Sequence, residues 1–135
     1  MGEVFDGRVD YIANYQNPSL GGLDALLNYP LSITMKNIWA WKSADMYSIR
    51  STIDYERTKF TDMDALVVFT DNHDNKRFLN INNDRKALQA SLVFSIFAQG
   101  IPCVYYGSEQ NYGGGDDPFN REQLWTNMIQ TTDTY

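Results

Sequence analysis

The sequence predicts an α/β protein built on a parallel sheet. Short β-prone runs alternate along the chain with longer segments whose apolar residues recur at helical spacing. Polar residues follow each β-prone run directly, as they do where parallel strands end at a functional edge of a sheet. The chain has 135 residues and no linker-like stretch, so we expect a single domain over residues 1–135.

The clearest unit lies in the second half of the chain. Residues 65–70 form a continuous apolar run, typical of a strand covered on both faces. A helix is predicted from residue 83 or 84 to 99, with Gly100 at the C′ position that often ends a helix. Residues 102–107 form the next strand, in which the lone Cys103 should behave as a small buried hydrophobe.

Two more strands are predicted upstream. Residues 25–29 form a short strand, and Pro30 suits the first turn of a helix over 31–43. A second helix is predicted over 45–59, and residues 2–5 fit the end of another strand. About four strands of this kind are half of a (β/α)8 TIM barrel, which typically needs around 250 residues.

Composition excludes some classes of function. The net charge is −6 and the basic residues are scattered, which argues against a nucleic-acid partner. No apolar run approaches the roughly 20 residues that cross a bilayer, so no membrane partner is expected. The first seven residues lack the basic and apolar regions of a signal peptide. Aromatic residues make up 14 % of the chain, which fits sugar stacking or, more commonly, core packing.

Carboxylates and a histidine follow the predicted strands. The polar residues at the strand ends are Glu3, Asp6, Asn28, His73, Asp74 and Glu109. Because barrel enzymes assemble their sites at this edge, a carboxylate pair here suits glycoside hydrolysis, in which one acid protonates the leaving oxygen. The alternative is that residues 72–75 are only a turn, since Asn and Asp favour turns, and spacing alone slightly favours that interpretation.

Several motifs occur in order and at matching spacing. They span residues 3–7, 15–17, 27–30, 69–78, 100–102, 105–110 and 113–122. Together they resemble the signature regions of the α-amylase family of glycoside hydrolases, and in particular its fungal-type members. The resemblance implies the second half of the catalytic barrel, truncated at the N-terminus, from a retaining enzyme that cleaves α-1,4-glucosidic bonds of starch or glycogen.

The resemblance also assigns roles. Glu3 matches the general acid/base and Asp74 the carboxylate that stabilises the transition state. His73 matches a histidine that binds the sugar at the cleavage point. Asp117 and Arg121 match a pair that contacts the same sugar.

Further interpretations remain open beside these roles. Gly7, with Asp6, would shape the acceptor-side wall. His73 could instead be a packed structural residue, and Arg121 could form only a surface ion pair. Glu109 could simply order its loop. Burial or a neighbouring Asp74 would keep Glu3 protonated for its role as acid.

The same resemblance indicates what this chain lacks. The family's nucleophilic aspartate should precede Glu3, yet only two residues do, so we expect the isolated chain to be inactive. Ca²⁺ is expected for the intact family member, with ligands outside this chain and no metal site within it. Half a barrel also leaves sheet edges unpaired, which predicts instability, aggregation or self-association of the isolated chain.

Three functional hypotheses follow. The first is a fragment of an endo-acting hydrolase of α-glucan polysaccharide or malto-oligosaccharide. The second is an α-glucosidase or transglycosylase of the same family. The third is a non-catalytic relic or sugar-binding fragment. Family resemblance alone suggests a secreted protein, and the motifs specify neither the exact substrate nor the mode of cleavage.

Overall fold

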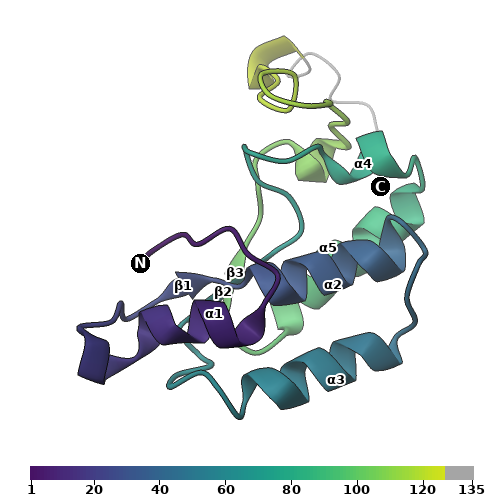
Figure 1. The fold of residues 1–135 in the computed structure, drawn as a ribbon. Coiled ribbons are helices and arrows are strands. Elements are labelled where there is room, and N and C mark those ends of the chain that lie inside the picture. Colours follow the sequence, from purple (N-terminus) through teal and green to yellow (C-terminus); the bar gives the residue numbers. More distant parts are fainter. Residues whose placement is uncertain (127–135) are drawn as a thin grey trace.

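The computed structural model describes residues 1–126, which form a small parallel sheet with helices packed against it (Figure 1). The strands are β1 (Leu26–Leu27), β2 (Leu66–Phe69) and β3 (Ile101–Cys103), in that order across the sheet. Both pairings are parallel. Gly2 adds a parallel bridge to Leu26 on the outer side of β1. The predicted strands therefore occur in the predicted order, the first of them as a single bridge. The last ends at Cys103, four residues earlier than predicted.

Within residues 1–126, five α-helices and four short 3₁₀ turns accompany these strands. The α-helices are α1 (Val9–Ala13), α2 (Tyr29–Trp39), α3 (Tyr47–Glu56), α4 (Phe78–Ile81) and α5 (Arg85–Phe97). The 3₁₀ turns cover Asn14–Gln16, Pro18–Leu20, Ser108–Gln110 and Leu124–Thr126. Helices α2 and α5 both pack on β2 and on each other, and α3 packs on α2 (Figure 1). Each β–α–β connection thus keeps successive strands parallel, as the alternating pattern predicted.

Local capping explains the helix boundaries. The Asn28 side chain accepts a 3.0 Å hydrogen bond from the Leu31 backbone N–H, so α2 begins at Tyr29, two residues earlier than predicted. Pro30 lies in its first turn, as expected. Asp84 caps α5 by accepting from the first-turn amides. All three long helices end earlier than predicted, and the short helices α1 and α4 were not predicted.

Gly100 does not have the predicted C′ role. The helix ends at Phe97, and Ala98 is already extended with φ −68° and ψ 158°. Gly100 instead has a φ of +117°, and a Cβ there would overlap the Leu66 carbonyl oxygen. Glycine is required because the turn before β3 passes directly against the β2 backbone.

Burial of the strands depends on their neighbours. All four residues of β2 are buried, which confirms the prediction of a strand covered on both faces. All three residues of β3 are exposed, so the prediction of a buried Cys103 is wrong for the described chain. The physical reason is that β3 pairs only with β2 and lies at the open edge of the sheet among residues 1–126.

The open edge also leaves apolar side chains exposed. Phe97, next to β3 in the fold, is 83 % exposed, and Val93 and Val104 are also exposed. A core of two clusters nevertheless includes residues of β2. Leu66 and Phe69 pack with residues of α1, and Val68 packs with residues of α2 and α3. This core holds the strand ends, and thus the loops that follow them, in fixed relative positions.

Candidate active site

Glu3 lies just beyond the Gly2 bridge, at the same edge of the sheet as the residues that follow β1 and β2. Tyr29, two residues after β1, donates a 2.5 Å hydrogen bond from its hydroxyl to Glu3 Oε1. Asn72, in the loop after β2, donates from Nδ2 to the same hydroxyl at 2.7 Å. Three strand ends are therefore joined by one hydroxyl group, as the parallel topology predicts for residues at this edge.

The surroundings of Glu3 differ from expectation in one respect. We expected burial or Asp74 to keep this carboxyl protonated, but the Glu3 side chain is exposed among the described residues. Its polar contact is the hydroxyl of Tyr29. Burial of Glu3 is thus not supplied by residues 1–126.

Asp74 lies in a cluster with His73, Asp117 and Arg121. The His73 Nε2 atom is 3.4 Å from Asp74 Oδ1, and Arg121 Nη2 lies 3.5 Å from the same oxygen. Arg121 Nε also contacts Asp117 Oδ1 at 2.8 Å and the His73 carbonyl oxygen at 3.2 Å. These side chains are about half exposed, so they remain accessible to a ligand.

The alternatives left open by the sequence can be compared with this geometry. His73 and Asp74 do form a turn, but the turn presents both side chains to solvent. Arg121 does pair with Asp117, and the same guanidinium also reaches Asp74 and His73. The turn and the ion pair are therefore real, and both are compatible with a binding site. The individual roles of these residues remain predictions.

A buried side chain that sequence reasoning did not single out holds the His73 loop. Asn120 is fully buried, and its Nδ2 atom donates to the carbonyl oxygens of His73 at 2.8 Å and Asn75 at 2.9 Å. Asn120 lies within the motif over 113–122, but nothing in its local pattern indicates a partner some 47 residues away. The contact joins the loop after β3 to the loop after β2.

Arg77 makes a second connection between these loops, and its side chain is fully buried. Its Nε atom donates to the Asn120 carbonyl oxygen and to Glu122 Oε2, each at 3.0 Å, and its Nη1 atom donates to the Tyr106 carbonyl oxygen at 2.7 Å. The guanidinium also lies over the Tyr105 ring, 4.0 Å from its centroid. Figure 1 shows the two loops running together away from the sheet toward α4.

Asp71 fixes the first residues after β2. Its carboxylate accepts from the Phe78 backbone N–H at 2.9 Å and from the Ser108 hydroxyl at 3.4 Å. Burial raises the pKa of Asp71, and the buried ammonium of Lys36 opposes that shift. Burial also lowers the pKa of Lys36. The loop that presents His73 and Asp74 therefore starts from a rigid, internally bonded segment.

A pocket of about 540 Å³ lies beside these residues. Its lining residues are Phe5, Tyr29, Ser32, Ile33, Lys36, Trp41, Phe69, Asp74, Asn75, Lys76, Ile81 and Asp116. Asp74 and Tyr29 thus line the same pocket, and Tyr29 is the hydrogen-bond partner of Glu3. Aromatic and aliphatic side chains supply half of these lining residues, and polar or charged side chains supply the other half.

Gly7 lies next to this pocket and not within the His73 cluster. A Cβ at Gly7 would come 3.3 Å from the Cδ1 atom of Ile33, which lines the pocket. Its neighbour Asp6 is bound to Arg8, whose hydrogen bonds lower the pKa of Asp6 to about 2. This placement is compatible with the predicted wall, whereas contact of Gly7 with a sugar stays a prediction.

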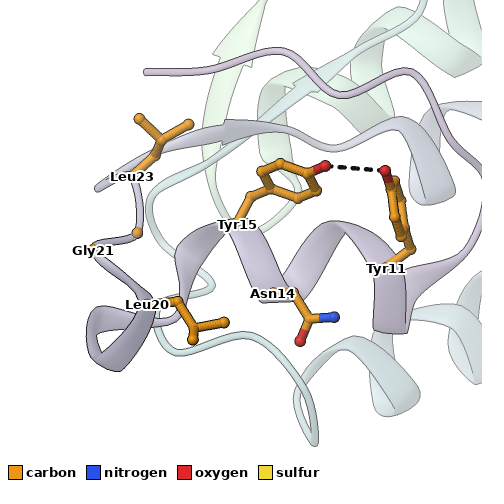
Figure 2. Close-up of a pocket in the computed structure, with 7 residues that line it drawn as sticks. Tyr11, Asn14, Tyr15, Leu20, Gly21 and Leu23 are labelled. Carbon is orange, nitrogen blue, oxygen red and sulfur yellow. Dashed lines mark hydrogen bonds between the residues drawn. The ribbon is translucent and has the colours of Figure 1, made fainter.

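A smaller cavity of about 350 Å³ is lined by residues of α1 and of the turns that follow it (Figure 2). Its lining includes Tyr11 and Tyr15, whose hydroxyls are 3.0 Å apart, with Leu20 and Leu23 opposite them. The lining contains no carboxylate, imidazole or thiol, so it offers no acid or base for hydrolysis.

No metal centre is formed by the described part of the chain. Within residues 1–126, no three or more His, Cys, Asp or Glu side chains gather in a way that could hold an ion. The residues present therefore do not fit the Ca²⁺ expected from the family resemblance, because calcium needs several oxygen ligands together. The same residues contain no helix long and apolar enough to cross a membrane.

A parallel α/β fold with carboxylates beside a pocket at the strand ends has the arrangement in which (β/α)8 barrel enzymes build their sites. Residues 1–133 match the family model described as the α-amylase catalytic domain, so the chain belongs to the α-amylase family. This confirms both the resemblance and the predicted fold class, part of a (β/α)8 barrel. The members of this family are enzymes.

Individual relatives agree with this assignment. The chain is 36 % identical to α-amylase 1 of Lipomyces kononenkoae over 135 residues, which is 100 % of this chain and 21 % of that protein. It is 35 % identical to α-amylase 1 of Schwanniomyces occidentalis, covering 26 % of that protein. The structure of an α-amylase from Malbranchea cinnamomea superposes with a TM-score of 0.84 at 35 % identity, over 92 % of this chain and 26 % of that one.

The family also includes relatives with a different activity. A cyclomaltodextrin glucanotransferase of a Bacillus strain is 32 % identical over 132 residues, which is 98 % of this chain and 18 % of that enzyme. The chain thus spans about a quarter or less of the length of the relatives it matches. The activity of the whole protein therefore remains a proposal.

Proposed function

We propose that the protein containing this chain is an α-amylase: a retaining hydrolase of α-1,4-glucosidic bonds in starch, glycogen or malto-oligosaccharides. The observation that carries the proposal is the pocket of about 540 Å³, because Asp74 and the Glu3-bound Tyr29 both line it. Secretion of the protein is part of the same proposal and is supported by family membership alone.

In this proposal Glu3 is the general acid/base. Its Oε1 atom takes the hydrogen bond from Tyr29, which leaves Oε2 to hold the proton and deliver it to the glycosidic oxygen. Asp74 supplies negative charge next to the sugar as positive charge develops in the transition state. Arg121 and His73 orient the Asp74 carboxylate from one side.

Retention of configuration requires a second carboxylate that attacks the sugar, with the two carboxyl groups about 5–5.5 Å apart. We assign that nucleophile, and the ligands of any Ca²⁺, to parts of the protein outside these 135 residues. The isolated chain should accordingly bind sugar at most weakly and hydrolyse nothing.

The test uses the protein expressed from the complete reading frame that contains this chain, assayed on soluble starch. Glu3→Gln and Asp74→Asn should each lower kcat by about 100-fold or more, the usual contribution of such groups. Asp54→Asn is the matched control, because Asp54 is an exposed carboxylate on α3 paired with Arg50. Activity of Glu3→Gln within tenfold of the parent would refute the assignment.

The cyclomaltodextrin glucanotransferase relatives favour glycosyl transfer as a second candidate. Product analysis on starch separates the candidates. An endo-acting α-amylase gives mixed linear oligosaccharides, a transglycosylase gives cyclic or elongated products, and an α-glucosidase releases glucose. Binding of malto-oligosaccharides with no hydrolysis by the complete protein would indicate the non-catalytic alternative.

A further inference from the structure

The ring of Tyr29 packs in the core, and that packing does not require the hydroxyl group. The residue is only 2 % exposed, and its ring packs edge-on against Phe5 at 4.9 Å and Phe69 at 5.2 Å between centroids. It is the first residue of α2, directly after the Asn28 cap and before Pro30. The backbone and ring are therefore held firmly, and the hydroxyl is aimed at Glu3 with little freedom to move.

The direction of each hydrogen bond around this hydroxyl follows from the donors present. The Asp74 backbone N–H can only donate, and it contacts Asn72 Oδ1 at 3.2 Å. The Asn72 amide must therefore turn its Nδ2 atom toward Tyr29, where it donates to the phenolic oxygen. Since the phenol has one hydrogen, that hydrogen is given to Glu3 Oε1.

The hydroxyl keeps this proton over the working range of pH. Burial and the neighbouring Glu3 raise the pKa of Tyr29 well above its usual value. It acts as a fixed donor to Glu3 while its own oxygen is held by Asn72. Asn72 in turn receives the Asp74 amide, so the chain of bonds continues into the loop that carries Asp74.

We propose that Tyr29 is a positioning residue that locks the Glu3 carboxyl in register with the Asp74 loop through Asn72. This inference rests on the proposed function of Glu3 and Asp74. As Glu3 gives up its proton to the leaving oxygen, negative charge develops on its carboxylate. A preorganised O–H already directed at Oε1 stabilises that charge more than it stabilises the neutral acid.

The test is Tyr29→Phe in the protein expressed from the complete reading frame, because this change removes only the hydroxyl and keeps the packed ring. We expect kcat on malto-oligosaccharides to fall about 10- to 100-fold with KM within about threefold, since a misplacement of roughly 1 Å can cost a factor of about 100. The alkaline limb of the kcat/KM profile should move to higher pH, because a donor that favours the ionised carboxylate is lost.

Tyr55→Phe is the matched control. It removes a similar tyrosine–carboxylate hydrogen bond, 2.6 Å to Asp10, at an exposed site on α3 and α1. Its kcat and pH profile should equal those of the parent. Asn72→Ala should reproduce the Tyr29→Phe pH shift in part, and the double variant should lose less than the product of the two single losses.

Two results would overturn the inference. One is a Tyr29→Phe enzyme with the parent's kcat and pH profile. The other is a loss of activity that follows a lowered Tm with an unchanged pH profile, which indicates a purely structural role. If Tyr29→Phe does not fold, the inference is tested by Asn72→Ala, whose kcat/KM profile should shift to higher pH. An unchanged profile in that variant would overturn the inference. Failure of the proposed function has a different signature, because Glu3→Gln would then remain active.

Discussion

Glu56 provides a direct test of how burial controls a charge in this fold. Its side chain lies at the end of α3 and is fully buried. Oε2 accepts a 3.2 Å hydrogen bond from Asn28 Nδ2, whereas Oε1 has no hydrogen-bond partner among the described residues. A buried carboxylate with half of its bonding capacity unfilled is costly, so burial raises the pKa of Glu56 to about 7.

The sign and size of the effect on stability follow from linkage. The folded protein binds this proton more tightly than the unfolded chain, whose Glu56 pKa is near 4.5. The contribution of Glu56 to stability is therefore fully present below pH 4.5 and is lost as the pH rises from about 4.5 to about 7. At about 1.4 kcal/mol for each pH unit, the loss reaches about 3 kcal/mol above pH 7.

Glu56→Gln should remove this pH dependence, because the amide has nearly the same shape and no charge. The stability of the variant relative to the parent should increase by about 3 kcal/mol between pH 4.5 and pH 8. Urea denaturation of the parent and variant at several pH values measures the difference. Asp54→Asn, at an exposed position, is the control and should leave the pH dependence unchanged. Parallel stability curves for the parent and Glu56→Gln would refute the reasoning.

Three further predictions follow from the fold. Gly100→Ala should lower the free energy of unfolding by about 2 kcal/mol or more, as measured by urea denaturation. Gly21→Ala, with φ +70° and open space around it, should lower it less. Equal losses would contradict the close approach of Gly100 to the β2 backbone. Arg77→Lys should lower stability by about 3 kcal/mol, because an ammonium cannot replace the buried guanidinium fork, and a neutral result in the same assay would contradict this. The isolated chain should self-associate through its open sheet edge, where Phe97 and Ile101 are exposed; size-exclusion chromatography tests this, and a monomer with a sharp, reversible melt would disprove it.

Elements with strong local patterns were predictable from the sequence. The continuous apolar run of β2 and the periodic apolar residues of α5 identify a strand and a helix without knowledge of their partners. The boundaries were less predictable, because they depend on capping by particular side chains. Helix α2 begins two residues earlier than predicted, because the Asn28 side chain and Pro30 together define its first turn.

Features that depend on distant parts of the chain were not predictable in the same way. Cys103 has an apolar local sequence, but its exposure is decided by how many strands pair with β3. The sequence predicted Tyr29 as the last residue of a strand. Its contact with Glu3 was not predictable, because the two residues are 26 positions apart in the sequence. The motifs identified Glu3 and Asp74 as candidates, whereas the residues that hold them in place emerge only from the folded chain.

These supporting contacts separate the stability of the fold from the geometry of the candidate site. Glu56 accepts a hydrogen bond from Asn28, and its ionisation changes the free energy of unfolding because burial raises its pKa. The Tyr29 hydroxyl contacts Glu3 and Asn72, and the ring that anchors it survives its removal. Because Asn28 both donates a hydrogen bond to Glu56 and caps the helix that begins with Tyr29, the two effects meet at one residue. Ionisation of Glu56 should therefore affect the candidate site only by weakening the Asn28 cap of α2. This effect should occur between about pH 4.5 and about pH 7, where the contribution of Glu56 to stability is lost.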